Sequence, residues 1–175
     1  MNRKILIIIL FLLFVSADYY KVDAQQTGTR IKNADSSYPE SVIWLNQPRE
    51  ITDIRLLLQD GKKECAVKKA RDYVAKLENL GGFEARQRLY YGLCALCGAL
   101  TSTGELEEAI ETCNRAVKLE PGRWQGLNNR GTAYYVSGQI DLALKDYREA
   151  LLQVQYSEML TELVQHNIGL AEAKK

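Results

Sequence analysis

Four cysteines and one histidine are the side chains of this 175-residue chain that are best suited to redox, nucleophilic or metal chemistry. Cys94 and Cys97 form a CxxC motif, a spacing found in thiol–disulfide oxidoreductases and in zinc sites. The redox motif begins a helix next to a strand, whereas this CxxC falls inside a helical pattern. A zinc site needs about four ligands, and no second CxxC is present. We interpret the pair as small packing residues, and a thiol enzyme stays as an alternative.

The single histidine, His166, lies one helical turn after Glu162. A histidine and a glutamate can transfer protons, but an exposed helical pair at this spacing is common. No serine or cysteine nucleophile can be placed beside His166 from the sequence. No glycine-rich loop for phosphate is present either. We therefore expect no catalytic residue, no cofactor and no metal ion, and predict that the protein is not an enzyme.

Composition and charge place the chain among ordinary globular proteins, with 46% hydrophobic and 26% charged residues. The net charge of +1 gives no electrostatic argument for nucleic acid or for an anionic membrane as a partner. One basic cluster alternates with apolar positions, which is typical of a solvated helix face, and an anionic partner is the alternative. Its members are Lys62, Lys63, Lys68, Lys69 and Arg71.

The first residues have the three parts of a secretory signal peptide. A basic patch at residues 2–4 precedes an apolar run of 11 residues, Ile5 to Val15, and small residues follow at Ser16 and Ala17. The run is shorter than the ~20 residues of a membrane span. We predict cleavage after Ala17, or as late as Ala24, and keep an uncleaved membrane anchor as the alternative. The protein is then exported, and we favour a bacterial periplasm over a eukaryotic secretory lumen.

Residues 18–46 form a leader or linker, because they have few large apolar residues and many turn formers. Trp44 and Leu45 are exceptions, and we expect them to dock onto the first helix pair. From Pro48 onward, apolar residues recur at spacings of three and four, which predicts helices throughout and no strand. We expect helices over 48–59, 65–78, 83–102, 106–117, 124–136, 140–151 and 159–173.

Small residues recur at a fixed offset of 34 in this helical part: Gly104 and Gly138, Ala109 and Ala143, Ala116 and Ala150. Thirty-four residues is the period of the tetratricopeptide repeat, a stacked helix–turn–helix unit. Residues 90–123 and 124–157 each resemble one such repeat. Residues 47–79 resemble a weaker third copy, and 158–173 resemble a terminal cap. The gap of 43 residues from Gly61 to Gly104 implies about nine inserted residues near Phe83.

The resemblance implies an all-α fold, a right-handed superhelix of about three helix hairpins with a C-terminal capping helix, over residues 47–175. Gly131 and Ala143 would let the two helices of a hairpin approach closely, with Tyr147 beside them. Cys97 stands where the family usually has glycine, and Cys113 where it has an aromatic residue. In this register the two cysteines face each other, and we consider a disulfide between them.

The family binds extended peptides or partner helices in a concave groove lined by the first helix of each hairpin. Carried onto this chain, the groove would be lined by Tyr91, Cys94, Gly98, Thr101, Gln125, Asn128, Thr132 and Tyr135. We expect Asn128 to be the main contact, since an amide both donates and accepts hydrogen bonds. A clamp for a terminal carboxylate is not predicted, because Cys94 stands where that subtype has a lysine.

The leading hypothesis is an exported protein–protein interaction module that acts as an adaptor or assembly factor and binds a protein or peptide. It would contact no nucleic acid and, after cleavage, no membrane. A second hypothesis is a self-associating structural repeat protein that pairs through its first hairpin or its terminal helix, because short repeat arrays leave end faces open. A membrane-anchored scaffold with an uncleaved N-terminal segment is a further alternative.

Overall fold

The computed structural model describes residues 48–175, and the predicted signal peptide, leader and docking of Trp44 and Leu45 lie outside this range. The described part is built from helices and contains no strand. The helices are α3 (Arg49–Gln59), α4 (Lys63–Glu78), α5 (Phe83–Thr103), α6 (Leu106–Leu119), α7 (Trp124–Val136), α8 (Ile140–Gln153) and α9 (Glu158–Glu172). The predicted all-α class is confirmed for these residues, and the expected helix bounds agree within a few residues.

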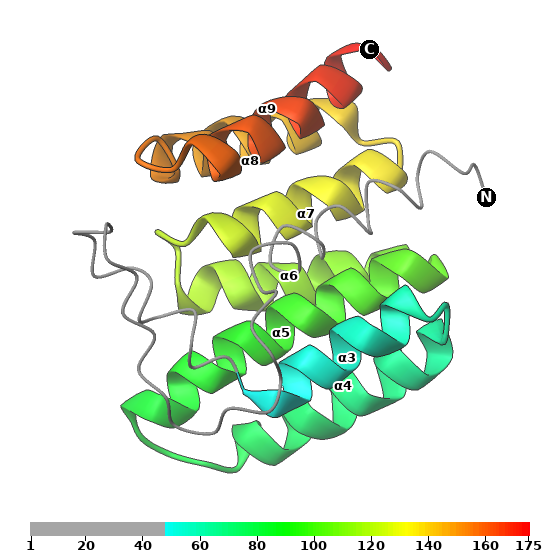
Figure 1. Cartoon of the computed structure of the whole chain (residues 1–175), viewed down its shortest axis with the longest axis vertical. Helices are drawn as coiled ribbons and strands as arrows, with labels where there is room; N and C mark the ends of the chain where they lie inside the picture. The colour runs from blue at the N-terminus through cyan, green and yellow to red at the C-terminus, as the bar shows by residue number, and fades with distance from the viewer. Residues whose placement is uncertain (1–47) are drawn as a thin grey trace, which may run out of the picture.

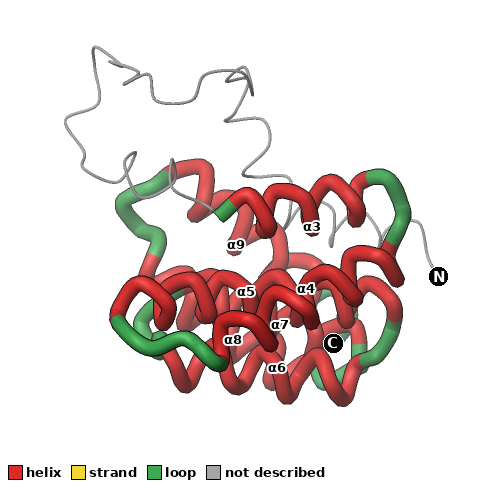
Figure 2. Tube along the Cα trace, turned by 90° about the horizontal axis from the view of Figure 1, so that it is seen from below, coloured by secondary structure: helices red, strands yellow, loops and turns green. Residues whose placement is uncertain are grey.

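The helices stack as consecutive antiparallel hairpins, α3 with α4, α5 with α6 and α7 with α8, with α9 last (Figure 1). Alternate helices α3, α5, α7 and α9 also contact one another in succession, so they form the inner layer of the stack. Seen end-on, α3 and α9 lie on the side opposite to α6 and α8 (Figure 2). This arrangement is a helical repeat solenoid.

Three glycines make the tight turns inside the hairpins. Gly61, Gly104 and Gly138 have φ values of +75°, +88° and +83°, a region that other residues rarely adopt. At the last of these turns, Gln139 N–H donates to the Tyr134 carbonyl at 2.8 Å and closes the end of α7. Gly104 and Gly138 thus occupy the same turn position in successive hairpins, which explains the 34-residue offset between them.

Helices α7 and α8 approach each other closely at Gly131. A Cβ atom built on Gly131 would lie 2.8 Å from the Tyr147 ring and 3.3 Å from the Ala143 carbonyl oxygen. Tyr147 cannot withdraw easily, because it is 1% exposed and its hydroxyl donates to Thr132 Oγ1 at 3.1 Å. The predicted close contact of Gly131 and Ala143 is therefore confirmed.

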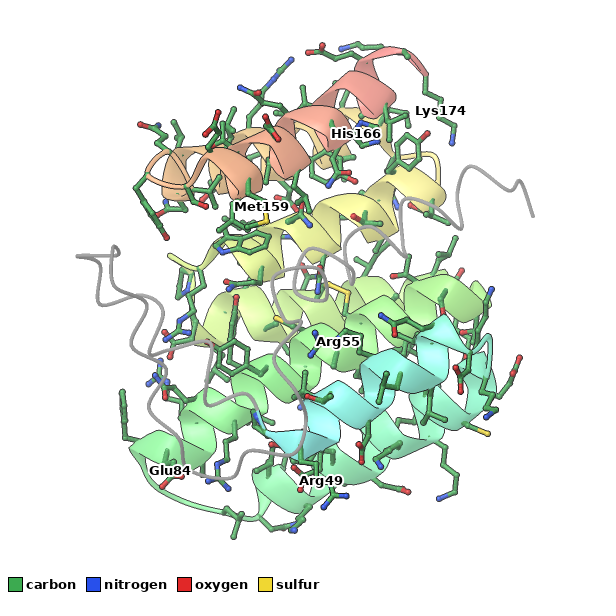
Figure 3. All side chains as sticks on the ribbon, in the orientation of Figure 1. Arg49, Arg55, Glu84, Met159, His166 and Lys174 are labelled. Carbon is green, nitrogen blue, oxygen red and sulfur yellow. A yellow bond between two sulfur atoms is a disulfide. The ribbon has the colours of Figure 1, made fainter. Side chains whose placement is uncertain are left out.

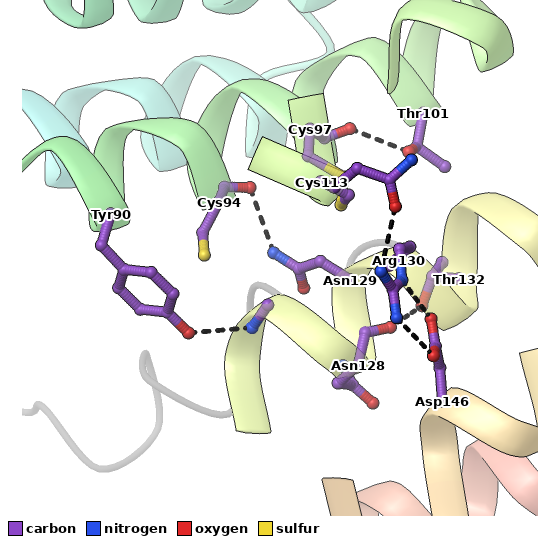
Figure 4. Close-up of a disulfide and its surroundings, with 12 residues drawn as sticks. Tyr90, Cys94, Cys97, Thr101, Cys113, Asn128, Asn129, Arg130, Thr132 and Asp146 are labelled. Atoms are coloured by element: carbon purple, nitrogen blue, oxygen red, sulfur yellow. Dashed lines mark hydrogen bonds and ion pairs between the residues drawn. A yellow bond between two sulfur atoms is a disulfide. The ribbon is translucent and has the colours of Figure 1, made fainter. Parts of the chain in front are cut away.

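A disulfide joins α5 to α6 at the equivalent point of the preceding hairpin (Figure 4). Cys97 and Cys113 are both fully buried, and their Cα atoms lie 5.5 Å apart. The other two cysteines are free, Cys65 on the surface and Cys94 in the interior. The pairing considered from the repeat register is thus the pairing that the structure has.

An ion pair joins the two helices of the last complete hairpin, and a hydrogen bond connects it to the preceding hairpin. The Arg130 guanidinium of α7 donates to both carboxylate oxygens of Asp146 on α8, at 2.6 and 2.8 Å. It also donates to Asn114 of α6 at 2.9 Å (Figure 4). Asp146 is only 2% exposed, so a bidentate arginine is the partner that can satisfy its charge there.

The two ends of the stack differ. At the C-terminal end, the exposed side of α9 is mostly polar, with Glu162, Gln165, His166 and Glu172 on it. A polar outer face is what a terminal repeat needs to stay in water. Near the other end, α5 has 21 residues against 13 for α7, and its first residue, Phe83, is 76% exposed.

Two glycine substitutions should have opposite effects on stability. Gly131→Ala should lower the free energy of unfolding by about 1–3 kcal/mol, because its methyl group meets the fixed Tyr147 ring. Gly98→Ala in α5 should raise it by up to about 1 kcal/mol, because alanine is the better helix former and the new Cβ meets no atom of the described residues within 4 Å. Urea denaturation of the two variants measures both, and equal effects would contradict the assigned packing.

The disulfide should contribute about 3 kcal/mol to stability, the value for closing a loop of about 15 residues. The variant with Cys97→Ala and Cys113→Ala should unfold at correspondingly lower denaturant concentration without reductant. Thiol titration of the wild type should find one reactive thiol in the native protein, two after unfolding and four after reduction. Four thiols in unreduced, unfolded protein would contradict the bond.

Candidate protein-binding face of α5 and α7

The structure divides the eight predicted groove residues into two sets. Tyr91, Gly98 and Gln125 are partly exposed. Cys94, Thr101, Asn128, Thr132 and Tyr135 are buried, each 9% exposed or less. The buried set lies at contacts between helices, where a partner cannot reach it while the stack is intact.

Asn128 is the clearest correction. Its side chain is 1% exposed, and its Oδ1 accepts a hydrogen bond of 2.9 Å from Nδ2 of Asn167 on α9. Asn167 is itself 3% exposed. The expectation of a groove contact at Asn128 was wrong in its orientation, because α9 covers this side of α7. The amide holds the terminal helix in place.

The other buried members are also occupied by neighbouring groups. Thr132 Oγ1 donates to the Asn128 carbonyl at 3.0 Å, and Thr101 Oγ1 donates to the Cys97 carbonyl at 2.8 Å. The ammonium of Lys174 lies 4.4 Å from the centre of the Tyr135 ring, close enough for a cation–π contact. Their small or aromatic side chains fill helix contacts, which sequence spacing alone could not separate from groove positions.

A partly exposed strip runs along α5 and α7 on the inner layer, and we call it the α5–α7 strip. Its residues are Tyr91, Ala95, Gly98, Gln125 and Asn129. Asn129 was missed by the sequence analysis. Its Nδ2 donates to the Cys94 carbonyl at 3.1 Å across the two helices (Figure 4). Its spacing of four from Gln125 is the signal that would have placed it on the same helix face.

Arg123, just before α7, was also missed. Its guanidinium lies over the rings of Tyr90 and Tyr91, 5.4 and 5.6 Å from their centres, and Nη1 donates to the Tyr91 hydroxyl at 2.8 Å. Stacking on aromatic faces is a preferred setting for arginine. The residue is partly exposed, so it adds a positive charge to the α5–α7 strip at the start of α7.

The Tyr90 ring packs against the Arg123 guanidinium from inside the stack. It is fully buried, and its hydroxyl accepts the Gly126 N–H at 2.9 Å (Figure 4). Gly126 leaves room for that approach, since a Cβ there would lie 3.4 Å from the hydroxyl. Burial raises the pKa of Tyr90 far above its ordinary value, so the phenol stays neutral at every physiological pH.

The two cysteines of the CxxC motif are not available for thiol chemistry in the native fold. Burial raises the pKa of the Cys94 thiol to about 12, which keeps it protonated and unreactive near neutral pH. Cys97, the other half of the CxxC, is in the disulfide. His166 and Glu162 are both on the exposed side of α9, and Figure 3 labels the histidine.

Residues 48–175 contain no group of three or more His, Cys, Asp or Glu side chains that could hold a metal ion. None of their helices is long and apolar enough to cross a membrane.

Stacked helix hairpins with a partly exposed strip on the inner layer define an α-helical repeat protein. Comparisons with known proteins identify the repeat. Residues 98–123 match the family model of the tetratricopeptide repeat. Over 64 residues the chain is 36% identical to the peptidyl-prolyl cis-trans isomerase PASTICCINO1 of Arabidopsis thaliana, covering 37% of the chain and 10% of that protein. Over 117 residues it is 26% identical to DnaJ homolog subfamily C member 3 of Gallus gallus, covering 65% of the chain and 22% of that protein.

Together with the stacked helix hairpins, these matches support a tetratricopeptide-repeat protein. The repeat is a non-catalytic protein-interaction fold, so the chain carries a protein–protein interaction module. It spans between a tenth and a quarter of the length of these two relatives, and the isomerase and DnaJ names describe those proteins as wholes.

The burial of Asn128 leads to a stability prediction. Asn128→Ala leaves the Asn167 amide buried without its partner and should lower the free energy of unfolding by about 1–3 kcal/mol. Asn167→Ala should do the same, and the double variant should cost less than the sum of the two. Denaturant unfolding of the four proteins measures this coupling, which should be about 0.5–3 kcal/mol. Additive losses, or no loss at all, would mean that the two amides do not pair.

Proposed function

We propose that this protein is an exported adaptor or assembly factor that binds an extended protein segment on the α5–α7 strip. The observation that carries this proposal is the character of the strip itself. Tyr91, Gln125 and Asn129 remain partly exposed, as Gly98 does, whereas Thr101 and Thr132 of the same helices are hydrogen-bonded inside the stack.

The side chains of the strip suit a peptide ligand. A tyrosine offers contact area at low entropic cost, and amide side chains both donate and accept hydrogen bonds, so they can pair with a peptide backbone. Gly98 leaves room above α5, because a Cβ there would meet no atom of the described residues within 4 Å. A bound chain can therefore approach the helix backbone closely at this point.

Export is supported by two independent features. The N-terminal pattern of a basic patch, an apolar run and small residues is that of a signal peptide. Disulfides form and persist in oxidising compartments and are rare in the cytosol, and the Cys97–Cys113 bond lies in the centre of the fold. The non-catalytic role rests on the repeat fold and on the protonated, buried Cys94.

The test begins with crosslinking in the native compartment, which supplies the partner. Gly98→Trp should then reduce binding of that partner more than about tenfold, because an indole at Gly98 fills the space above α5. Isothermal titration with the purified partner measures the change. The matched control is Ala75→Trp on the exposed, outer side of α4, which should bind like the wild type.

Circular dichroism and sedimentation velocity of both variants show whether helicity and association state are kept. A folded Gly98→Trp protein with unchanged affinity would exclude the α5–α7 strip as the binding surface. Loss of affinity in both variants would point to an effect on the whole stack and would equally remove the support for this strip.

A further inference from the structure

The two helices that carry the α5–α7 strip have fewer carboxylate side chains than the outer helices beside them. The outer helices α4, α6 and α8 each carry three acidic residues: Glu64, Asp72 and Glu78; Glu107, Glu108 and Glu111; Asp141, Asp146 and Glu149. The inner helix α7 carries none. In α5 the single acidic residue, Glu84, lies in the first turn and pairs with Arg88. The α5–α7 strip therefore has no carboxylate of its own.

Arg123 is a cation at one end of this strip, and most of its N–H donors make no hydrogen bond to the described residues. A guanidinium has about five N–H donors. Among the described residues, Arg123 uses one of them in a hydrogen bond, from Nη1 to the Tyr91 hydroxyl. Its stacking on Tyr90 and Tyr91 occupies a face of the guanidinium and leaves the donor edge in its plane available.

The nearest carboxylate does not neutralise this charge. Glu120 Oε2 lies 4.0 Å from Nε of Arg123, too far for a hydrogen bond. The same carboxylate is 3.3 Å from Nε of Arg86 on α5. One carboxylate is thus shared by two guanidinium groups, and this end of the strip keeps a net charge of +1.

We propose that Arg123, held against Tyr90 and Tyr91, binds an aspartate or glutamate side chain of the partner, so that the α5–α7 strip selects acidic extended segments. This inference rests on the proposed function and adds the chemical class of the ligand. Arginine binds carboxylates through paired N–H donors, and the absence of acidic groups from the strip removes the repulsion that would oppose such a ligand. Gln125 and Asn129 lie farther along the strip than Arg123. Their amide side chains can bind the backbone of the ligand next to its acidic residue.

The experiment uses the oxidised, purified protein and three fluorescent peptides of equal length, measured by fluorescence anisotropy. The first has alternating glutamate and alanine with an amidated C-terminus, the second has glutamine in place of glutamate, and the third is the glutamine peptide with a free C-terminal carboxylate. The acidic peptide should bind about tenfold more tightly than the amidated glutamine peptide, and raising the salt concentration should reduce this preference.

Three variants assign the preference to Arg123. Arg123→Gln should remove the roughly tenfold preference for the acidic peptide. Arg115→Gln makes the same charge change on α6, where Arg115 pairs with Glu78 of α4, and it should leave the preference intact. Glu120→Gln should strengthen binding of the acidic peptide, because it removes the competing carboxylate. That gain cannot arise from misfolding.

Equal binding of the acidic and glutamine peptides by the wild type would overturn the inference, and so would equal effects of Arg123→Gln and Arg115→Gln. If the third peptide matched the acidic one, the ligand would be a chain terminus and the assignment to a side chain would be wrong. A partner whose binding is lost in Gly98→Trp but unchanged in Arg123→Gln would leave the proposed function standing and remove only the acidic ligand.

Discussion

The close approach of the two helices within each hairpin is the constraint on which the rest of the structure depends. In the α7–α8 hairpin Gly131 faces the Tyr147 ring. Thirty-four residues earlier the same two positions are Cys97 and Cys113, joined by a disulfide in the α5–α6 hairpin. In the α7–α8 pair a glycine, which has no side chain, faces a large aromatic ring. In the α5–α6 pair two small cysteine side chains face each other and are covalently bonded. Both keep the helices near enough for the next hairpin to stack in the same way.

Because this contact sets the angle between inner and outer helices, it also determines which inner side chains are covered. Asn128 and Tyr135 turn toward α9 and its C-terminal lysine, while Gln125 and Asn129 stay at the surface. The adjacent residues Asn128 and Asn129 thus have different roles on α7. Asn128 holds the terminal helix, and Asn129 belongs to the partly exposed strip. A polar core contact such as Asn128–Asn167 also favours one register of α9, since any shift would leave two buried amides unpaired.

The sequence predicted most of the fold, because its strongest signals are local. Apolar periodicity gave the helix bounds, and the repeated glycines at Gly104 and Gly138 gave the turns. The repeat register placed Cys97 opposite Cys113 and left their disulfide as one of several options. The candidate face was predicted only in part. Whether Asn128 or Asn129 is exposed depends on the rotation of α7 by a fraction of a turn, which is decided by how α7 packs against α8 and α9 and not by the sequence of α7 itself.

The scarcity of carboxylates on α5 and α7 connects this packing to recognition. Outer helices carry acidic residues that pair with arginines and lysines of neighbouring helices, as Arg71 does with Glu105 and Glu108. The same pairing along the α5–α7 strip would occupy a binding surface with internal contacts. Arg123 is instead held by aromatic rings, which fix its position without neutralising its charge. A guanidinium positioned in this way loses little side-chain entropy when it meets a carboxylate, and this preorganisation favours an acidic ligand over a neutral one.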